Sequence, residues 1–559
     1  MTVARLGPVL AILLLIGPVF FGLAGTFLPA FGYLPALGGH DLSLAPFADL
    51  MAKSGIVMSS LISLMAGIVT AGISLGLVIL FIAAWAGTAV FARVQHLISP
   101  LLSVPHAAAA FGFAFLIAPS GMILRLISPE LTGWDRPPDL LIVNDMLGLS
   151  MMAGLVVKEI PFLLLVTLAA LPQVPLAKTR QLAASLGYGR MSGFLFVAWP
   201  PIYRQIRLAV FAVIAFASSV VDVAAILGPT TPAPLAVRLV DWMNDPELSM
   251  RFLASAGAML QLGVTMAALG IWMVLERICA AVGQFACERG WRLRRDAALR
   301  QAALAGMIAA ASAIVFGLAV LLLWSFAGLW QFPDALPQNF SMRNWMRSAP
   351  RIADPLATTL LVGALSTLIA TALAMLCLMR EDETVRPPGR VMMLIYVPLI
   401  VPQAAFLFGL QLLFIGSGTD ASLPALVLTH LVFVLPYVFL SLADPWRAFD
   451  RRYEAVASGL GASRWRTYWR VRLPMLLRAA LTASAVGFAV SIGQYLPTVL
   501  IGAGRLTTIT TEAVALASGG NRRIIGVYAI CQMLLPIIGF LIATAVPTLL
   551  FRNRRAMRV

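Results

Sequence analysis

Long apolar runs, each followed by a short polar or charged stretch, dominate this sequence. A helix that crosses a bilayer needs about 20 mostly apolar residues, and a soluble domain carries about 25% charged residues. Here 60% of the residues are hydrophobic and only 11% are charged. The sequence therefore predicts an all-α polytopic membrane protein with about twelve transmembrane helices.

The expected spans are divided evenly between the two halves of the chain. In the first half they lie near Val9–Phe27, Ile56–Phe91, Leu101–Leu124, Leu147–Leu171, Ile206–Leu227 and Phe252–Ala280. In the second half they lie near Ala303–Leu329, Leu356–Met379, Met392–Phe414, Leu423–Leu442, Leu477–Leu500 and Ile524–Leu550. An even number of spans in each half makes the two halves run in the same direction, as parallel repeats do.

Internal repeats support this division. Placing Gly187 on Gly461, 274 residues later, also aligns Ala183 with Ala457 and Pro200 with Pro474 without a gap. A second pair of blocks, VPHAAAAFG from Val104 and VPQAAFLFG from Val401, lies in the third span of each half. We expect a first domain at 1–287, a basic linker at 288–300 and a second domain at 301–559.

The charge distribution fixes the expected orientation. The net charge is +16, and the Lys and Arg residues gather in alternate loops, which the positive-inside rule assigns to the cytoplasm. Both termini are then cytoplasmic, as is the linker, whose charge that rule fully explains. This placement argues against nucleic acid as a partner. The cysteines Cys279, Cys287, Cys377 and Cys531 show no metal-ligand spacing.

The repeated segments are two basic loops, loop 1 at about 172–205 and loop 2 at about 444–478. Each reads as a short helix, a glycine that provides a turn, an amphipathic stretch, and a proline at the start of the next span. Basic amphipathic loops are common at cytoplasmic faces, but basicity alone does not explain why the Gly-to-Pro separation is the same twice. Such a loop can dock in a groove of a partner and transmit movement to the attached spans.

These loops resemble the EAA coupling loop of the membrane subunits of binding-protein-dependent type I ABC importers. Residues at the matching positions are Ala183, Leu186, Gly187 and Pro200 in loop 1, and Ala457, Leu460, Gly461 and Pro474 in loop 2. The acidic position of the motif is Gln181 in loop 1 and Ala455 in loop 2, where Glu454 precedes it. The fused chain is similar to the thiamine and ferric-iron uptake permeases.

This resemblance implies an inward transport subunit of a prokaryotic plasma (inner) membrane, not an enzyme, working by alternating access. It implies two copies of a separate ATPase, which would carry ATP and Mg, and an extracytoplasmic solute-binding protein. A P-loop needs a Lys after a Gly, and none of Lys53, Lys158 and Lys178 follows one. The sequence does not indicate the transported substrate.

Polar residues within the apolar spans are candidates for a translocation path, because ionisable groups are costly in a bilayer. The candidates are His106, Lys158, Glu159, Asp222, Gln403 and Gln494. His106 and Gln403 follow the equivalent prolines Pro105 and Pro402, and we expect them to face each other near the pseudo-axis. Alternatively, they satisfy backbone carbonyls freed by the prolines.

A twelve-helix secondary transporter explains the topology equally well. It does not call for a Gly-to-Pro loop in each half, and it would rely on ion-coupling carboxylates in the spans, of which Glu159 and Asp222 qualify. A membrane scaffold without transport is a third, weaker reading.

Overall fold

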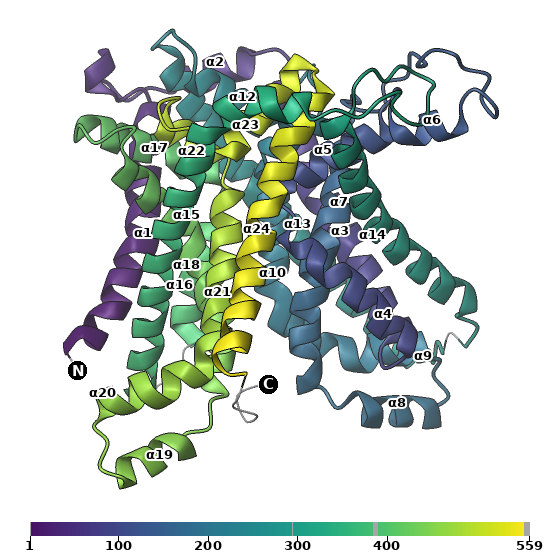
Figure 1. Cartoon of the computed structure of the whole chain (residues 1–559), viewed down its shortest axis with the longest axis vertical. Helices are drawn as coiled ribbons and strands as arrows, with labels where there is room; N and C mark the ends of the chain where they lie inside the picture. Colours follow the sequence, from purple (N-terminus) through teal and green to yellow (C-terminus); the bar gives the residue numbers. More distant parts are fainter. Residues whose placement is uncertain (1, 293, 384–388, 553–559) are drawn as a thin grey trace.

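A computed structural model of the chain describes residues 2–292, 294–383 and 389–552, and these residues form helices connected by turns and loops (Figure 1). Within the described residues, 11 helices are long and apolar enough to cross a membrane, or 12 if one bent pair counts as a single span. The expected all-α polytopic architecture with about twelve spans is confirmed. The linker residue 293 lies outside the described ranges.

The first half contains thirteen α-helices and four shorter helical turns among its described residues. They are α1 (Thr2–Ala30), η1 (Pro35–Leu37), α2 (Ala45–Ala52), α3 (Ile56–Trp85), α4 (Ala89–Ile98), η2 (Ser99–Ser103), α5 (His106–Ile117), α6 (Met122–Ile127), α7 (Leu149–Ala170), η3 (Leu171–Gln173), α8 (Leu176–Ser185), α9 (Arg190–Gly193), the π-helical turn η4 (Phe194–Ala198), α10 (Trp199–Ser219), α11 (Asp222–Leu227), α12 (Leu235–Met243) and α13 (Met250–Glu288).

The second half repeats the main elements in the same order. They are α14 (Ala297–Phe326), α15 (Arg343–Glu383), α16 (Gly389–Ile400), α17 (Gln403–Gly416), α18 (Leu423–Arg447), α19 (Arg452–Gly459), α20 (Arg464–Thr467), the π-helical turn η5 (Tyr468–Arg472), α21 (Leu473–Ile492), α22 (Leu496–Gly502), α23 (Ile509–Ala515), η6 (Leu516–Gly519) and α24 (Arg522–Leu550). Helix α14 thus corresponds to α1, α17 to α5, and α21 to α10.

The prolines of the repeated blocks interrupt the third span of each half more strongly than a kink does. Helix α5 begins at His106, directly after Pro105, and α17 begins at Gln403, directly after Pro402. The residues Leu394–Ile400 and Gln403–Gly416 meet at an angle of 97°. Proline has no N–H to donate and pushes the preceding residue out of the helical region, so the helix restarts after it. The spans expected at Leu101–Leu124 and Met392–Phe414 are therefore not continuous helices: each is interrupted at its proline.

The two halves are interlocked through their first helices. Helix α1 packs on α17 and α15 of the second half, while α14 packs on α5 and α3 of the first half. Glycines allow both crossings: a Cβ on Gly112 would lie 2.8 Å from the carbonyl carbon of Gly317, and a Cβ on Gly409 would lie 2.0 Å from the oxygen of Gly22. Small residues let membrane helices approach closely. The buried core is accordingly shared, since one cluster joins Val19 to Phe406 and another joins Phe111 to Trp324.

Candidate functional site

Loops 1 and 2 project from the same end of the molecule, the end at which α1 begins and α24 finishes (Figure 1). Loop 1 carries α8 and α9, and loop 2 carries α19 and α20. The short helices α6, α12 and α23 lie at the opposite end. Two segments far apart in the sequence therefore present their surfaces in the same direction.

The two loops share one backbone conformation around their glycines. Gly187 has φ +77° and Gly461 has φ +80°, the left-handed region that residues with a Cβ rarely adopt. The amide of Tyr188 donates to Ala183 O at 3.0 Å, and the amide of Ala462 donates to Ala457 O at 3.0 Å. These bonds, with those from the glycine amides to the residues three positions earlier, form a Schellman motif in each loop. The repeated Ala and Gly residues therefore form the hydrogen bonds that end the first short helix of each loop.

A π-helical turn follows each loop helix at equivalent positions, and the sequence did not indicate it. The amide of Trp199 donates to Phe194 O, and the amide of Leu473 donates to Tyr468 O, each five residues back. Each turn ends beside Pro200 or Pro474, which lie in the first turn of α10 or α21. The wider turn suits a proline that cannot donate to the preceding turn and would clash with it. The helix therefore continues from the loop into the span, whereas the sequence placed its start at the proline.

Two arginines hold loop 1 against the end of α3. Arg180 and Arg190 each donate to Ala86 O, at 2.7 and 2.8 Å, and Arg190 also donates to Ala83 O at 3.3 Å. The last carbonyls of a helix lack partners within it and carry partial negative charge, so cations are favourable there. Burial lowers the pKa of the Arg180 guanidinium, which nevertheless stays charged at neutral pH because an Arg pKa is far above 7.

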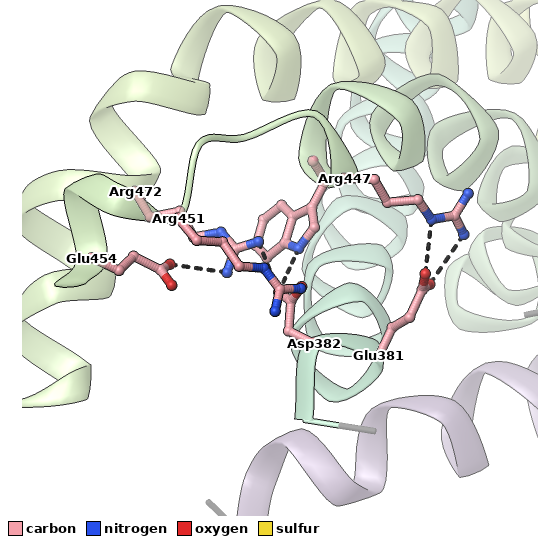
Figure 2. Close-up of polar contacts among 7 residues, drawn as sticks. Glu381, Asp382, Arg447, Arg451, Glu454 and Arg472 are labelled. Carbon is pink, nitrogen blue, oxygen red and sulfur yellow. Dashed lines mark hydrogen bonds and ion pairs between the residues drawn. The ribbon is translucent and has the colours of Figure 1, made fainter. Parts of the chain in front are cut away.

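Loop 2 is held against α15 by a different chemistry (Figure 2). Arg472, whose side chain is only 8% exposed, bonds to Asp382 Oδ2 at 2.7 Å and to Glu454 Oε1 at 3.1 Å. Its guanidinium lies 4.3 Å from the ring centroid of Trp446. Arg451 also bonds to Asp382, at 2.9 Å. Loop 2 is thus anchored by carboxylates at the end of α15, whereas loop 1 is anchored by backbone carbonyls at the end of α3.

The coupling residues expected from sequence divide into inward-facing and outward-facing sets. Ala183 is buried against Gly193, while Ala457 is half-buried. Gln181 is exposed, and Glu454 turns toward Arg472 of its own chain. Leu186 is 54% exposed and Leu460 is 83% exposed. The same loops carry other exposed apolar side chains: Leu182 in loop 1, and Val456 and Trp465 in loop 2.

The path residues expected in the first half form a polar group at helix breaks. His106 is the first residue of α5, and its Nε2 lies 3.1 Å from Glu159 Oε1 on α7. Lys158 Nζ donates to Leu102 O at 3.3 Å. Asp222, the first residue of α11, is buried and interacts electrostatically with His106. Adjacent residues Lys158 and Glu159 thus have separate principal partners.

In the second half the polar group has other members. His430 on α18 bonds to Ser491 Oγ at 2.8 Å and to Thr498 Oγ1 at 3.0 Å, at the break between α21 and α22. Gln494 lies in that break, and its carbonyl accepts from Thr498. His430 lies within the span expected at Leu423–Leu442, but the sequence does not indicate this network, because the partners of His430 lie more than 60 residues away. Among the described hydrogen bonds none joins His106 to Gln403, so their facing arrangement stays a prediction.

The fold defines an all-α polytopic membrane protein whose two halves carry equivalent loops at the same end of the molecule. Residues 386–553 match the family model described as "Binding-protein-dependent transport system inner membrane component". The chain is 31% identical over 524 residues to the inner membrane ABC transporter permease protein YnjC of Escherichia coli K12, which covers 92% of this chain and 93% of that protein.

Shorter relatives match part of the chain. A putative 2-aminoethylphosphonate transport system permease protein, PhnV of Salmonella paratyphi A, is 27% identical over 39% of this chain and 84% of its own length. The molybdenum transport system permease protein ModB of Mycobacterium bovis is 31% identical over 27% of this chain and 64% of its own length. The chain belongs to the permease subunits of binding-protein-dependent ABC importers. It is an inner-membrane transport component, and the secondary-transporter alternative is not supported.

Proposed function

We propose that this single chain serves as both membrane subunits of an importer, with one copy of a separate ATPase docked under each loop. The repeated loop geometry is the main support: in each half a Schellman turn presents exposed leucines beside it, at the same end of the molecule. A π-helical turn then joins each loop to a span, so a displaced loop moves α10 or α21 with it. The boundaries 1–287, 288–300 and 301–559 define the two domains and their linker in this proposal.

ATP and Mg bind to the partner in this scheme. The chain has no G-x-x-x-x-G-K-[ST] sequence, whose Lys and backbone N–H groups would hold the phosphates. The exposed apolar and basic residues of loops 1 and 2 offer a surface suited to a groove on another subunit. The end with the loops is cytoplasmic, as are both termini, although residues 553–559 lie outside the described ranges. An extracytoplasmic binding protein would deliver solute to the opposite end.

The solute path runs between the two domains, bordered by the polar groups at the helix breaks. His106, Lys158, Glu159 and Asp222 belong to one side, and Gln403 and Gln494 belong to the other. Ionisable and polar side chains inside a span are costly unless they serve a path or an internal bond. The named substrates of the relatives differ from one another, so we propose only a small charged solute.

Alternating access follows from the connections between loops and spans. When ATP binding closes the ATPase pair, loops 1 and 2 approach each other, and α10 and α21 tilt with them. The interlocked helices α1 and α14 keep the two domains joined as the path opens toward the other side.

The decisive experiment is purification of the full chain from its native membranes under mild conditions. We expect an ATPase to co-purify in two copies per chain. Gly461→Glu should leave the protein in the membrane, since nothing lies within 4 Å of a Cβ at this position, but should uncouple ATP hydrolysis from uptake. Gly459→Glu, also in open space but two residues earlier and without the left-handed φ, is the matched control. Normal ATP-driven uptake by the Gly461→Glu variant would contradict the coupling role.

A further inference from the structure

The linker between the two domains is bonded to loop 1. The amide of Gly189 and the hydroxyl of Ser192 both donate to Arg292 O, each at 3.0 Å. Arg294 Nε donates to Gly187 O at 3.2 Å. The amide of Met191 donates to Asp296 Oδ2 at 3.3 Å. These bonds involve the glycine turn and the start of α9, which are the parts of loop 1 that are repeated in loop 2.

Asp296 in the linker caps the N-terminus of α9, for which loop 1 itself has no capping side chain. Each loop has a residue at the N-cap of its second short helix, Gly189 before α9 and Ser463 before α20, with φ −63° and −65°. Ser463 accepts a hydrogen bond from the amide of Arg466, whereas glycine has no side chain with which to accept one. The first amides of a helix need an acceptor from outside it. In loop 1 the buried carboxylate of Asp296, which approaches from the linker, is that acceptor.

The glycine turns show the same contrast. A Cβ on Gly187 would lie 2.9 Å from Arg294 Nη2 and 3.2 Å from Arg292 Nη1, whereas a Cβ on Gly461 would have nothing within 4 Å. Loop 1 is therefore covered on one side by the linker, and the equivalent side of loop 2 is open in the described structure. The two loops have the same backbone but different surroundings.

The linker also adds an exposed surface that continues that of loop 1. Trp291 is 53% exposed, and its ring packs edge-on against Phe285 at the end of α13, 6.2 Å between centroids. Arg292, Arg294 and Arg295 are exposed. This surface lies beside the turn that carries Leu186, so a subunit that docks on loop 1 meets an aromatic side chain and several positive charges as well.

We propose that the linker is part of the first docking site: Asp296 and the backbone of Arg292 position loop 1, and Trp291 with the linker arginines contacts the ATPase under it. The contact requires a carboxylate-bearing surface on that ATPase. The contact with the ATPase rests on the proposed function, whereas the positioning of loop 1 by the linker does not depend on it. The two docking sites for the ATPase are consequently inequivalent, and only the first includes residues of the linker between the domains.

The positioning role is tested on the purified full chain without any partner. The four natural cysteines are replaced by alanine, and one cysteine is introduced at a buried position of one loop. The rate of maleimide labelling of Ala183→Cys then reports opening of loop 1, and that of Thr467→Cys reports opening of loop 2. We expect Asp296→Ala to accelerate labelling at Ala183→Cys about five-fold and to leave Thr467→Cys unchanged.

Gly189→Ser should restore slow labelling at Ala183→Cys in the Asp296→Ala chain, because it gives loop 1 the cap that loop 2 has. An unchanged rate at Ala183→Cys, equal acceleration at both reporters, or failure of Gly189→Ser to restore the rate would overturn the positioning role.

The docking surface is tested on the chain purified together with the ATPase from its native membranes. A benzophenone maleimide on Trp291→Cys should cross-link to the ATPase, as should one on Leu186→Cys, and one on Leu131→Cys at the opposite end should not. Leu131 is 82% exposed, so poor labelling does not explain a negative result there. Cross-linking from Leu186→Cys but not from Trp291→Cys would overturn the linker contact alone. Absence of cross-links from both Leu186→Cys and Leu460→Cys would overturn the proposed function.

Discussion

Replacement of Arg472 should release loop 2 from the end of α15 (Figure 2). Arg472→Met keeps an unbranched side chain of similar length over Trp446 but removes the positive charge. Two charge-assisted bonds are lost, to Asp382 at 2.7 Å and to Glu454 at 3.1 Å. Charge-assisted hydrogen bonds contribute about 1.5–3 kcal/mol each, and removing one partner of a buried ion pair costs about 3–5 kcal/mol.

The expected loss is smaller than the sum of those values. The side chain of Asp382 is 20% exposed and that of Glu454 is 31% exposed, so water compensates part of the loss. Asp382 also retains its bonds with Arg451 and with the indole N–H of Trp446, each at 2.9 Å. We therefore expect the free energy of opening loop 2 to fall by about 2 kcal/mol, which raises the open population roughly 30-fold.

Maleimide labelling of Thr467→Cys measures this opening. Thr467 is 5% exposed and its hydroxyl has no hydrogen-bond partner in the described structure, so cysteine replaces it at little cost. Labelling should accelerate roughly 30-fold in Arg472→Met and by less in Arg472→Lys, which keeps the charge. Arg470→Met is the control, since Arg470 is exposed in the same π-helical turn. A rate within twofold of the parent, or equal acceleration by Arg470→Met, would refute the anchoring role of Arg472.

Three further outcomes are expected. Gly409→Ala should lower the melting temperature of the purified chain, because the Cβ would lie 2.0 Å from Gly22 O. Gly17→Ala, whose Cβ would have nothing within 4 Å, should leave the melting temperature unchanged. Equal effects of the two substitutions would show that the close crossing of α1 and α17 is not the cause. Gly461→Ala and Gly187→Ala should each cost about 1 kcal/mol of backbone strain, because the atoms that a Cβ on Gly187 would meet are the ends of the exposed Arg294 and Arg292 side chains, which can move aside; labelling of Thr467→Cys and Ala183→Cys should accelerate by similar factors, and a much larger effect of one substitution would contradict this. Alanine at His106, Gln403 and Asp222 together should abolish ATP-driven uptake while the protein remains in the membrane, and survival of transport would show that these residues do not line the path.

The sequence predicted the features that depend on local pattern. Apolar runs gave the number of spans, and the identity of Gly187 with Gly461 pointed to the two left-handed turns. Boundaries near Pro105 and Pro402 were wrong because a proline that restarts a helix and one that bends it leave similar sequence patterns. The π-helical turns were missed, since the proline that they adjoin also suits a helix start.

Contacts between distant residues account for the rest of what could not be predicted. Glu454 was a candidate coupling residue one position before the acidic position of the motif, and nothing in the sequence indicated that it bonds to Arg472. Loop 1 and loop 2 looked alike, yet one is anchored to backbone carbonyls and the other to carboxylates. The linker was given no role beyond its charge, because its bonds to loop 1 join residues about 100 positions apart. Local periodicity carries no information on such pairs.

The interlocked first helices have a consequence for biosynthesis. Thr26 of α1 accepts a hydrogen bond from the amide of Gly409, 383 residues further along the chain. At about 5–20 residues per second, roughly 20–80 s of translation separate the two. During that time α1 is in the membrane before its neighbour α17 has been synthesised. The side of α1 that carries the glycines is then open to contact with other helices. An insertase or chaperone that shields this side, or slow release of α1 from the translocon, would raise the yield of correctly assembled chains.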